Sequence, residues 1–114
     1  MRITKTGFVI AAILFFMTQV NAQNFVGDWK GAISMQGTSL ELVFHISEQD
    51  GVYTSTLDVP MQGATGIPVD KTEIIGDELK ITIAAIGASY EGTLTDNKLS
   101  GTFKQMGAEL PLEL

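Results

Sequence analysis

The segment at residues 40–46 reads Leu-Glu-Leu-Val-Phe-His-Ile, and every even-numbered side chain in it is apolar. Successive side chains of a β-strand point to opposite faces, so a period of two is typical of a strand with one buried face. The same period recurs from Phe25 onward, interrupted by Gly, Asp and Asn. The sequence therefore predicts an antiparallel all-β domain without a long helix.

Eight strands are expected from this pattern, joined by short turns. The fourth is the least regular, because Pro68 has no N–H to donate and fits only an edge, a bulge or the start of a strand. The expected ranges are 25–34, 39–47, 52–58, 66–75, 79–86, 89–95, 98–105 and 108–114.

One parity of these strands collects the apolar side chains and all the aromatic residues after position 22. A sheet with one apolar face must pack on another sheet or close on itself, and short links favour an up-and-down meander. We therefore expect a small closed or nearly closed barrel, which also removes exposed strand edges. The main structural residues of its interior are Trp29, Phe44, Tyr90 and Phe103, joined by Phe25, Ile33, Leu40, Leu42, Ile46, Tyr53, Leu57, Leu79, Ile81, Ile83, Leu94, Leu99, Leu110, Leu112 and Leu114.

The segment Gly27-Asp28-Trp29 lies at the head of the first expected strand. A Gly-x-Trp at this place resembles the start of lipocalin-like folds, in which the ring closes the bottom of the barrel. An eight-stranded barrel has an interior just wide enough for side chains or for one small ligand. Because aromatic rings, Leu and Ile are so frequent in the inner set, a filled core is favoured over a ligand cavity.

Residues 1–22 are expected to be an export signal. Arg2 and Lys5 precede an uninterrupted run of apolar or small residues from Gly7 to Met17, and the residues up to Ala22 suit a signal peptidase. A membrane span needs about 20 apolar residues, so no stable membrane anchor is expected. We therefore expect a secreted or periplasmic protein, cleaved near Ala22, with one β-barrel domain over residues 23–114.

The chain has seven Lys and Arg against 13 Asp and Glu, and it has no cysteine. Without Arg2 and Lys5 of the leader, five Lys remain against the same 13 acidic residues, a charge of −8. This balance argues against nucleic-acid binding and against docking on an anionic membrane. The missing cysteine excludes disulfides, a thiol nucleophile and thiolate metal sites.

The turns of an up-and-down meander divide between two ends, which here differ in chemistry. One end receives acidic turns such as Glu48-Gln49-Asp50-Gly51, and the other receives the three Met residues that follow the leader, each within two residues of a Gly. Methionine suits surfaces that accept apolar partners, and it also fills irregular core space. Two interpretations therefore stay open: a recognition surface, or a lid that plugs the barrel. The candidate binding residues are Met35, Gln36, Met61, Gln62 and Met106.

No catalytic residue, metal site or cofactor is expected. The single histidine, His45, falls on the outer parity, and a lone histidine is most often structural or exposed. The segment around Ser89 departs from a nucleophile elbow, because Glu91 stands where that motif needs Gly and a strand replaces the strand-to-helix turn.

Several strings resemble the N-terminal β-domain of secreted bacterial α/β-hydrolases of the serine aminopeptidase or esterase kind. They are Gly27–Gly31, Leu40–Ile46, Leu57–Val69, Tyr90–Gly92 and Gly101–Gly107, and the resemblance covers nearly all of residues 24–114. In that family a hydrolase domain with a Ser-Asp-His triad follows the β-domain, and no triad residue has a counterpart in this chain.

The resemblance implies an exported, non-catalytic accessory module that binds a partner, such as a separately encoded secreted hydrolase. A small lipocalin-like carrier of an apolar ligand and the product of a truncated hydrolase gene are the alternatives. A hydrolase that uses Ser89 is the third hypothesis and the one least expected from the residues.

Overall fold

The computed structural model describes residues 24–114, and the predicted leader at 1–22 lies outside these residues. The described part forms two antiparallel sheets and two short 3-10 turns. The first sheet contains β1 (Gly27–Met35), β2 (Thr38–Gln49), β3 (Val52–Val59) and β4 (Ala64–Pro68). The second contains β5 (Lys71–Ile75), β6 (Glu78–Ile83), β7 (Ala88–Thr95), β8 (Lys98–Gln105) and β9 (Ala108–Glu113). The 3-10 turns are η1 (Pro60–Gln62) and η2 (Ala84–Ile86).

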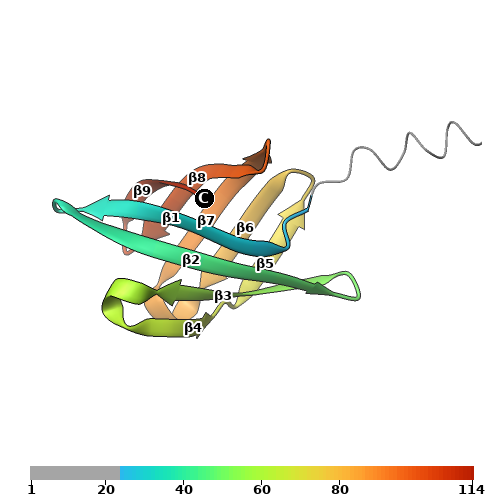
Figure 1. The fold of residues 1–114 in the computed structure, drawn as a ribbon, viewed down its shortest axis with the longest axis horizontal. Coiled ribbons are helices and arrows are strands. Elements are labelled where there is room, and N and C mark those ends of the chain that lie inside the picture. The colour runs from blue at the N-terminus through green and yellow to red at the C-terminus, as the bar shows by residue number, and fades with distance from the viewer. Residues whose placement is uncertain (1–23) are drawn as a thin grey trace, which may run out of the picture.

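Each strand pairs with its neighbour in the chain, so both sheets are up-and-down meanders. Figure 1 shows the two sheets lying one over the other, with their strands running in clearly different directions. The prediction of an antiparallel all-β domain is therefore confirmed. The hydrogen-bonded ladders define two sheets, and the closed barrel remains a prediction.

The predicted inner parity is the buried one. Across the first sheet Trp29 lies opposite Phe44, Phe44 opposite Leu57, and Leu57 opposite Ile67, which places all four side chains on the same face. Phe44, Tyr90 and Phe103 are fully buried, whereas Trp29 is half-buried and donates its indole N–H to the carbonyl oxygen of Phe25 at 2.8 Å. The two sheets therefore share one hydrophobic core between their facing sides.

The predicted strand at 66–75 is two strands, and this part of the sequence prediction was wrong. The chain bends at Val69 and Asp70, where the Val69 N–H donates to Ser55 of the first sheet and the Asp70 N–H donates to Thr82 of the second. The Asp70 carboxylate also accepts the N–H of Ala84 at 2.8 Å. These bonds hold a corner at which one strand leaves the first sheet and continues in the second, a usual way of joining two packed sheets.

The predicted strand at 79–86 ends earlier than expected, at Ile83. The chain turns there through η2 and then through Gly87, whose φ of +61° lies in the left-handed region that glycine adopts without strain. The same arrangement follows β3, where η1 is closed by Gly63. Period-two alternation does not register a 3-10 turn of this length, because the apolar residues continue through it.

Tyr90 connects the two sheets at the middle of the core. Its ring stacks on that of Phe44 with a centroid separation of 6.0 Å, and its hydroxyl donates to the carbonyl oxygen of Leu112 at 3.0 Å. A Cβ at Gly92 would lie 2.6 Å from that hydroxyl, so the phenol reaches β9 by crossing the space that a side chain at position 92 would fill. Burial raises the pKa of Tyr90 to about 12, so the phenol stays protonated as a donor.

Glycine also permits close backbone contacts at two further points. A Cβ at Gly31 would overlap the carbonyl oxygen of Glu113, which brings β1 of the first sheet against β9 of the second. A Cβ at Gly101 would overlap the carbonyl oxygen of Glu91 on the neighbouring strand. Both overlaps involve backbone atoms, which do not move aside as a flexible side chain does.

We expect Gly101→Ala to lower the free energy of unfolding by about 2–3 kcal/mol, because overpacking forces the backbone of β7 and β8 apart. Denaturant unfolding at neutral pH measures the change. Ser100→Ala is the control: position 100 is exposed on the same strand, and its substitution is expected to change stability by less than about 0.5 kcal/mol. Equal stability of the two variants would contradict the close approach at Gly101.

Candidate functional site

Four connections gather at one end of the molecule: the β1–β2 turn, η1, η2 and the β8–β9 turn. Their position follows from the antiparallel order, and in Figure 1 they lie on the left side of the ribbon. The segments at 34–40, 59–69, 83–90 and 105–108 contain no charged residue. We call this the uncharged end. The turns at the opposite end contain Asp50, Asp77 and Asp96, and the adjoining strand ends contain Glu48 and Glu78.

A cavity of about 130 Å³ opens between the sheets at the uncharged end. Two lining side chains, Gln62 and Ile86, come from η1 and η2, and the rest come from strands. Among the strand residues, Met35 and Gln105 are the last ones before the β1–β2 and β8–β9 turns, and the others are Ile33, Leu40, Leu42, Val59, Ile67 and Phe103. The cavity is therefore lined mainly by apolar side chains and has two amides, those of Gln62 and Gln105, among the residues nearest the turns.

The structure brings two of the five predicted binding residues, Met35 and Gln62, into the lining of this cavity. Gln36, Met61 and Met106 lie on the surrounding turns and do not line it. Met61 is 65% exposed and Met106 is 91% exposed, so neither side chain acts as an inward plug. Their role in binding remains a prediction.

Four lining residues are in neither the predicted inner set nor the predicted binding set: Val59, Ile67, Ile86 and Gln105. Gln105 lies two residues after Phe103, so the inner parity of β8 could have found it. Ile86 follows the 3-10 geometry of η2, in which the parity of the strand no longer applies. Ile86 and Gln105 are joined, because the side-chain amide of Gln105 donates to the carbonyl oxygen of Ile86 at 3.0 Å. That bond fixes the amide group at the edge of the cavity.

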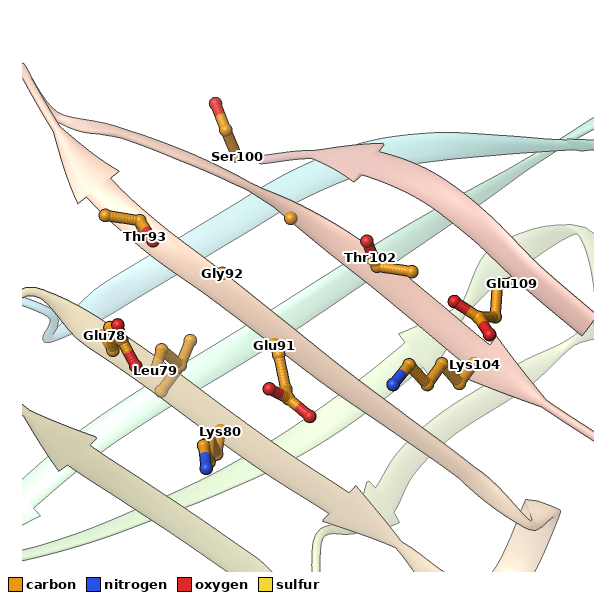
Figure 2. A pocket seen from close by; sticks show the side chains of 11 residues that line it. Glu78, Leu79, Lys80, Glu91, Gly92, Thr93, Ser100, Thr102, Lys104 and Glu109 are labelled. Carbon is orange, nitrogen blue, oxygen red and sulfur yellow. The ribbon is translucent and has the colours of Figure 1, made fainter.

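A larger groove of about 360 Å³ lies on the outer face of the second sheet (Figure 2). Its charged side chains belong to strands rather than to a converging set: Lys80 lies opposite Glu91, and Lys104 lies opposite Glu109. Opposite charges on neighbouring strands stabilise an exposed face. The groove is therefore the solvated side of a twisted sheet, as the alternation of charges predicted.

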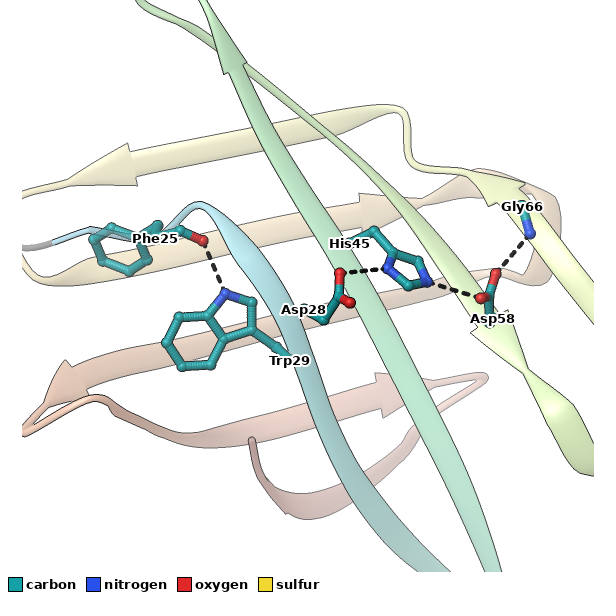
Figure 3. A network of polar contacts seen from close by, with 6 residues as sticks. All are labelled: Phe25, Asp28, Trp29, His45, Asp58 and Gly66. Atoms are coloured by element: carbon teal, nitrogen blue, oxygen red, sulfur yellow. Dashed lines mark hydrogen bonds and ion pairs between the residues drawn. The ribbon is translucent and has the colours of Figure 1, made fainter.

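The outer face of the first sheet contains a histidine between two carboxylates (Figure 3). His45 Nδ1 is 2.7 Å from an Asp28 oxygen, and His45 Nε2 is 2.8 Å from an Asp58 oxygen. The other Asp58 oxygen accepts the N–H of Gly66 at 2.7 Å. The bonds thus run across all four strands, from Asp28 on β1 through His45 and Asp58 to Gly66 on β4. We call this set of contacts the Asp-His-Asp bridge.

These contacts shift the pKa values of His45 and Asp58 in opposite directions. The hydrogen bond to Asp28, followed by the one to Asp58, raises the pKa of His45 above its ordinary value of 6.5. The hydrogen bond from Gly66, followed by the one from His45, lowers the pKa of Asp58 below its ordinary value of 3.8. Both shifts favour the charged forms.

The bridge does not include Ser89, the serine of the hydrolase hypothesis. Ser89 lies on the outer parity of β7 in the second sheet, whereas His45 lies on the outer parity of β2 in the first.

Among residues 24–114, no group of three or more His, Asp or Glu side chains is placed to hold a metal ion. The same residues contain no helix of the length and apolarity that a membrane crossing requires.

Comparisons with models of protein families, with curated proteins and with solved structures return no match to this chain. The assignment of a function therefore depends on the cavity, the uncharged end and the bridge.

The Asp-His-Asp bridge predicts a pH optimum of stability. The raised pKa of His45 stabilises the folded state. This stabilisation is complete at pH values below the pKa of the unfolded state, near 6.5, and it is lost as the pH rises through the pKa of the folded state. The lowered pKa of Asp58 contributes stability above 3.8 that is lost as pH falls through its folded value. The contribution of the bridge is therefore greatest between these two limits.

We expect the urea midpoint of the protein to fall between about pH 5.5 and about pH 9, and this fall to be largely absent in His45→Gln. Asp28→Asn, which removes one of the two carboxylates, should reduce the fall without abolishing it. An unchanged pH dependence in His45→Gln would show that other groups cause it.

Proposed function

We propose that the chain is a non-catalytic binding module that holds one apolar group, of the size of a single side chain, in the cavity at its uncharged end. The observation that carries the proposal is the cavity itself, to which η1, η2 and the strand ends beside the other two connections each contribute a side chain. Sites of this kind combine an apolar depth with a few placed polar groups.

The size of the cavity limits its occupant. An engineered apolar cavity of about 150 Å³ in another protein binds benzene or xenon, whereas pockets for drug-sized ligands measure about 300–1,000 Å³. At about 130 Å³ the cavity fits the end of a Leu, Ile or Phe side chain and not a lipid chain. The amides of Gln62 and Gln105 suit the peptide groups that flank such a side chain, since an amide both donates and accepts hydrogen bonds.

The surroundings of the cavity favour a protein partner over a free small molecule. Met61 and Met106 expose apolar, adaptable side chains on turns of the same end, and such contacts extend a binding surface beyond the cavity. We further propose that the module acts after export, next to a secreted hydrolase of the kind its sequence resembles. The contact of β1 with β9 at Gly31 and the bent corner at Val69 support a nearly closed barrel for this module.

The second candidate function is the transport of a small apolar molecule in the same cavity. The apolar lining favours it, and the volume restricts the cargo to molecules near the size of benzene. The two candidates differ in their use of the amides, which a hydrocarbon cargo does not need.

Two probes test these proposals in methyl NMR titrations: N-acetyl-L-leucinamide, which has an apolar side chain between two amides, and benzene. We expect both to shift the methyl signals of Ile33 and Ile67, and Gln62→Ala to weaken only the leucinamide. Ile86→Phe should fill the cavity and weaken both probes about tenfold or more, about 1.4 kcal/mol. Ile74→Phe is the matched control, because Ile74 is half-buried on β5 and does not line the cavity.

Four other outcomes have two meanings. Shifts with benzene alone, or equal weakening of both probes by Gln62→Ala, would favour the carrier. Shifts from neither probe, or shifts that persist in Ile86→Phe, would remove the cavity as a binding site.

A further inference from the structure

We infer that the Asp-His-Asp bridge is a proton-dependent clamp on the segment at 59–66, which contributes Met61 and Gln62 to the uncharged end. Protonated His45 holds this segment in the conformation that completes the cavity, and loss of the proton loosens it. The inference rests on the proposed function, because it concerns the regulation of the same site.

The geometry requires a charged ring. Both nitrogens of His45 lie within 2.8 Å of carboxylate oxygens, and a carboxylate only accepts hydrogen bonds. Neutral imidazole has one N–H, so its second nitrogen would direct a lone pair at an oxygen anion. Imidazolium alone donates to Asp28 and Asp58 together. The arrangement therefore belongs to one protonation state of the histidine.

The bridge reaches the binding end through Asp58. The pairing of β3 with β4 shifts register between Leu57 and Val59, so the backbone ladder is interrupted at Asp58. At this point the Asp58 carboxylate accepts a hydrogen bond from the N–H of Gly66, and so joins the two ends of the segment that contains η1. This side-chain hydrogen bond replaces a backbone hydrogen bond of the ladder, and its strength depends on the position of the Asp58 carboxylate.

The charged neighbours of His45 explain why the histidine controls that carboxylate. On the outer face, β1 presents Asp28 and Lys30, β3 presents Asp58, and β2 itself presents Glu41 farther along. The Ala64–Pro68 strand has no titratable side chain. His45 is the group among these that changes charge near neutral pH. The raised pKa of His45 and the lowered pKa of Asp58 agree with this assignment.

Loss of the proton removes the positive charge between two negative ones. Asp28 is 66% exposed and turns to water at little cost, whereas Asp58 is 24% exposed and loses the charged partner that holds its carboxylate beside the N–H of Gly66. The segment at 59–66 then samples more conformations. A site that is competent in only part of its population binds more weakly by that fraction.

The test is an NMR titration of the free protein from about pH 5 to about pH 9, following the His45 ring, the Gly66 amide and the Met61 methyl group. We expect all three to change with one midpoint, which lies above 6.5. The Met106 methyl group, on the β8–β9 turn of the other sheet, is the internal control and should not follow it. In Asp28→Asn the midpoint should fall for the three probes together, and in His45→Gln the transition should vanish from Gly66 and Met61.

A constant chemical shift of the Gly66 amide or the Met61 methyl group while His45 titrates would overturn the clamp. Different titration midpoints for the three probes in Asp28→Asn would also overturn it. The affinity for N-acetyl-L-leucinamide tests the regulation. It should be weaker by about threefold or more at about pH 9 than at about pH 5.5, and His45→Gln should show no such change. Equal affinity at both pH values would overturn the regulation alone, and absent binding at both would overturn the proposed function.

Discussion

The side chain of Tyr90 is the point on which the packing of the two sheets depends. It contacts Phe44 of the first sheet, crosses the open space above Gly92, and donates its hydroxyl hydrogen to a carbonyl of β9. A buried phenol without an acceptor would cost free energy, so the position of β9 and the absence of a side chain at Gly92 are linked to this one residue. The same contacts fix how far apart the two inner faces lie.

Much of this architecture was predictable, because a period of two assigns every side chain to a face. The inner set named from alternation is buried or half-buried throughout, and the charged parity lies outside. The bend at Val69 and Asp70 was missed, although the alternation changes phase across it: the half-buried side chains are Ile67 and Val69 before it and Thr72 and Ile74 after it. The hydrogen bonds that hold the bend, to Ser55 and Thr82, involve residues distant in the chain, which alternation does not reveal.

The candidate sites were predictable to different degrees. Antiparallel order alone places the uncharged turns at one end, whereas the cavity depends on how the two sheets pack. The pairing of Asp28 with His45 could have been derived, because the tight turn at Gln36 and Gly37 places residues at equal distances on either side of it opposite each other. Asp58 is a diagonal neighbour on the third strand, so its contact with His45 requires the register of two hairpins.

The bent corner separates the part of the chain that is synthesised first from the part that is synthesised later. All strands of the first sheet precede Val69, and all strands of the second follow Asp70. During synthesis the first sheet emerges with an apolar face that has no cover until the second half arrives. Such a half-formed intermediate exposes unpaired edges and aggregates readily, as nascent chains with delayed partners do. The order of the strands therefore leaves the apolar face of the first sheet uncovered until the strands after Asp70 have been made.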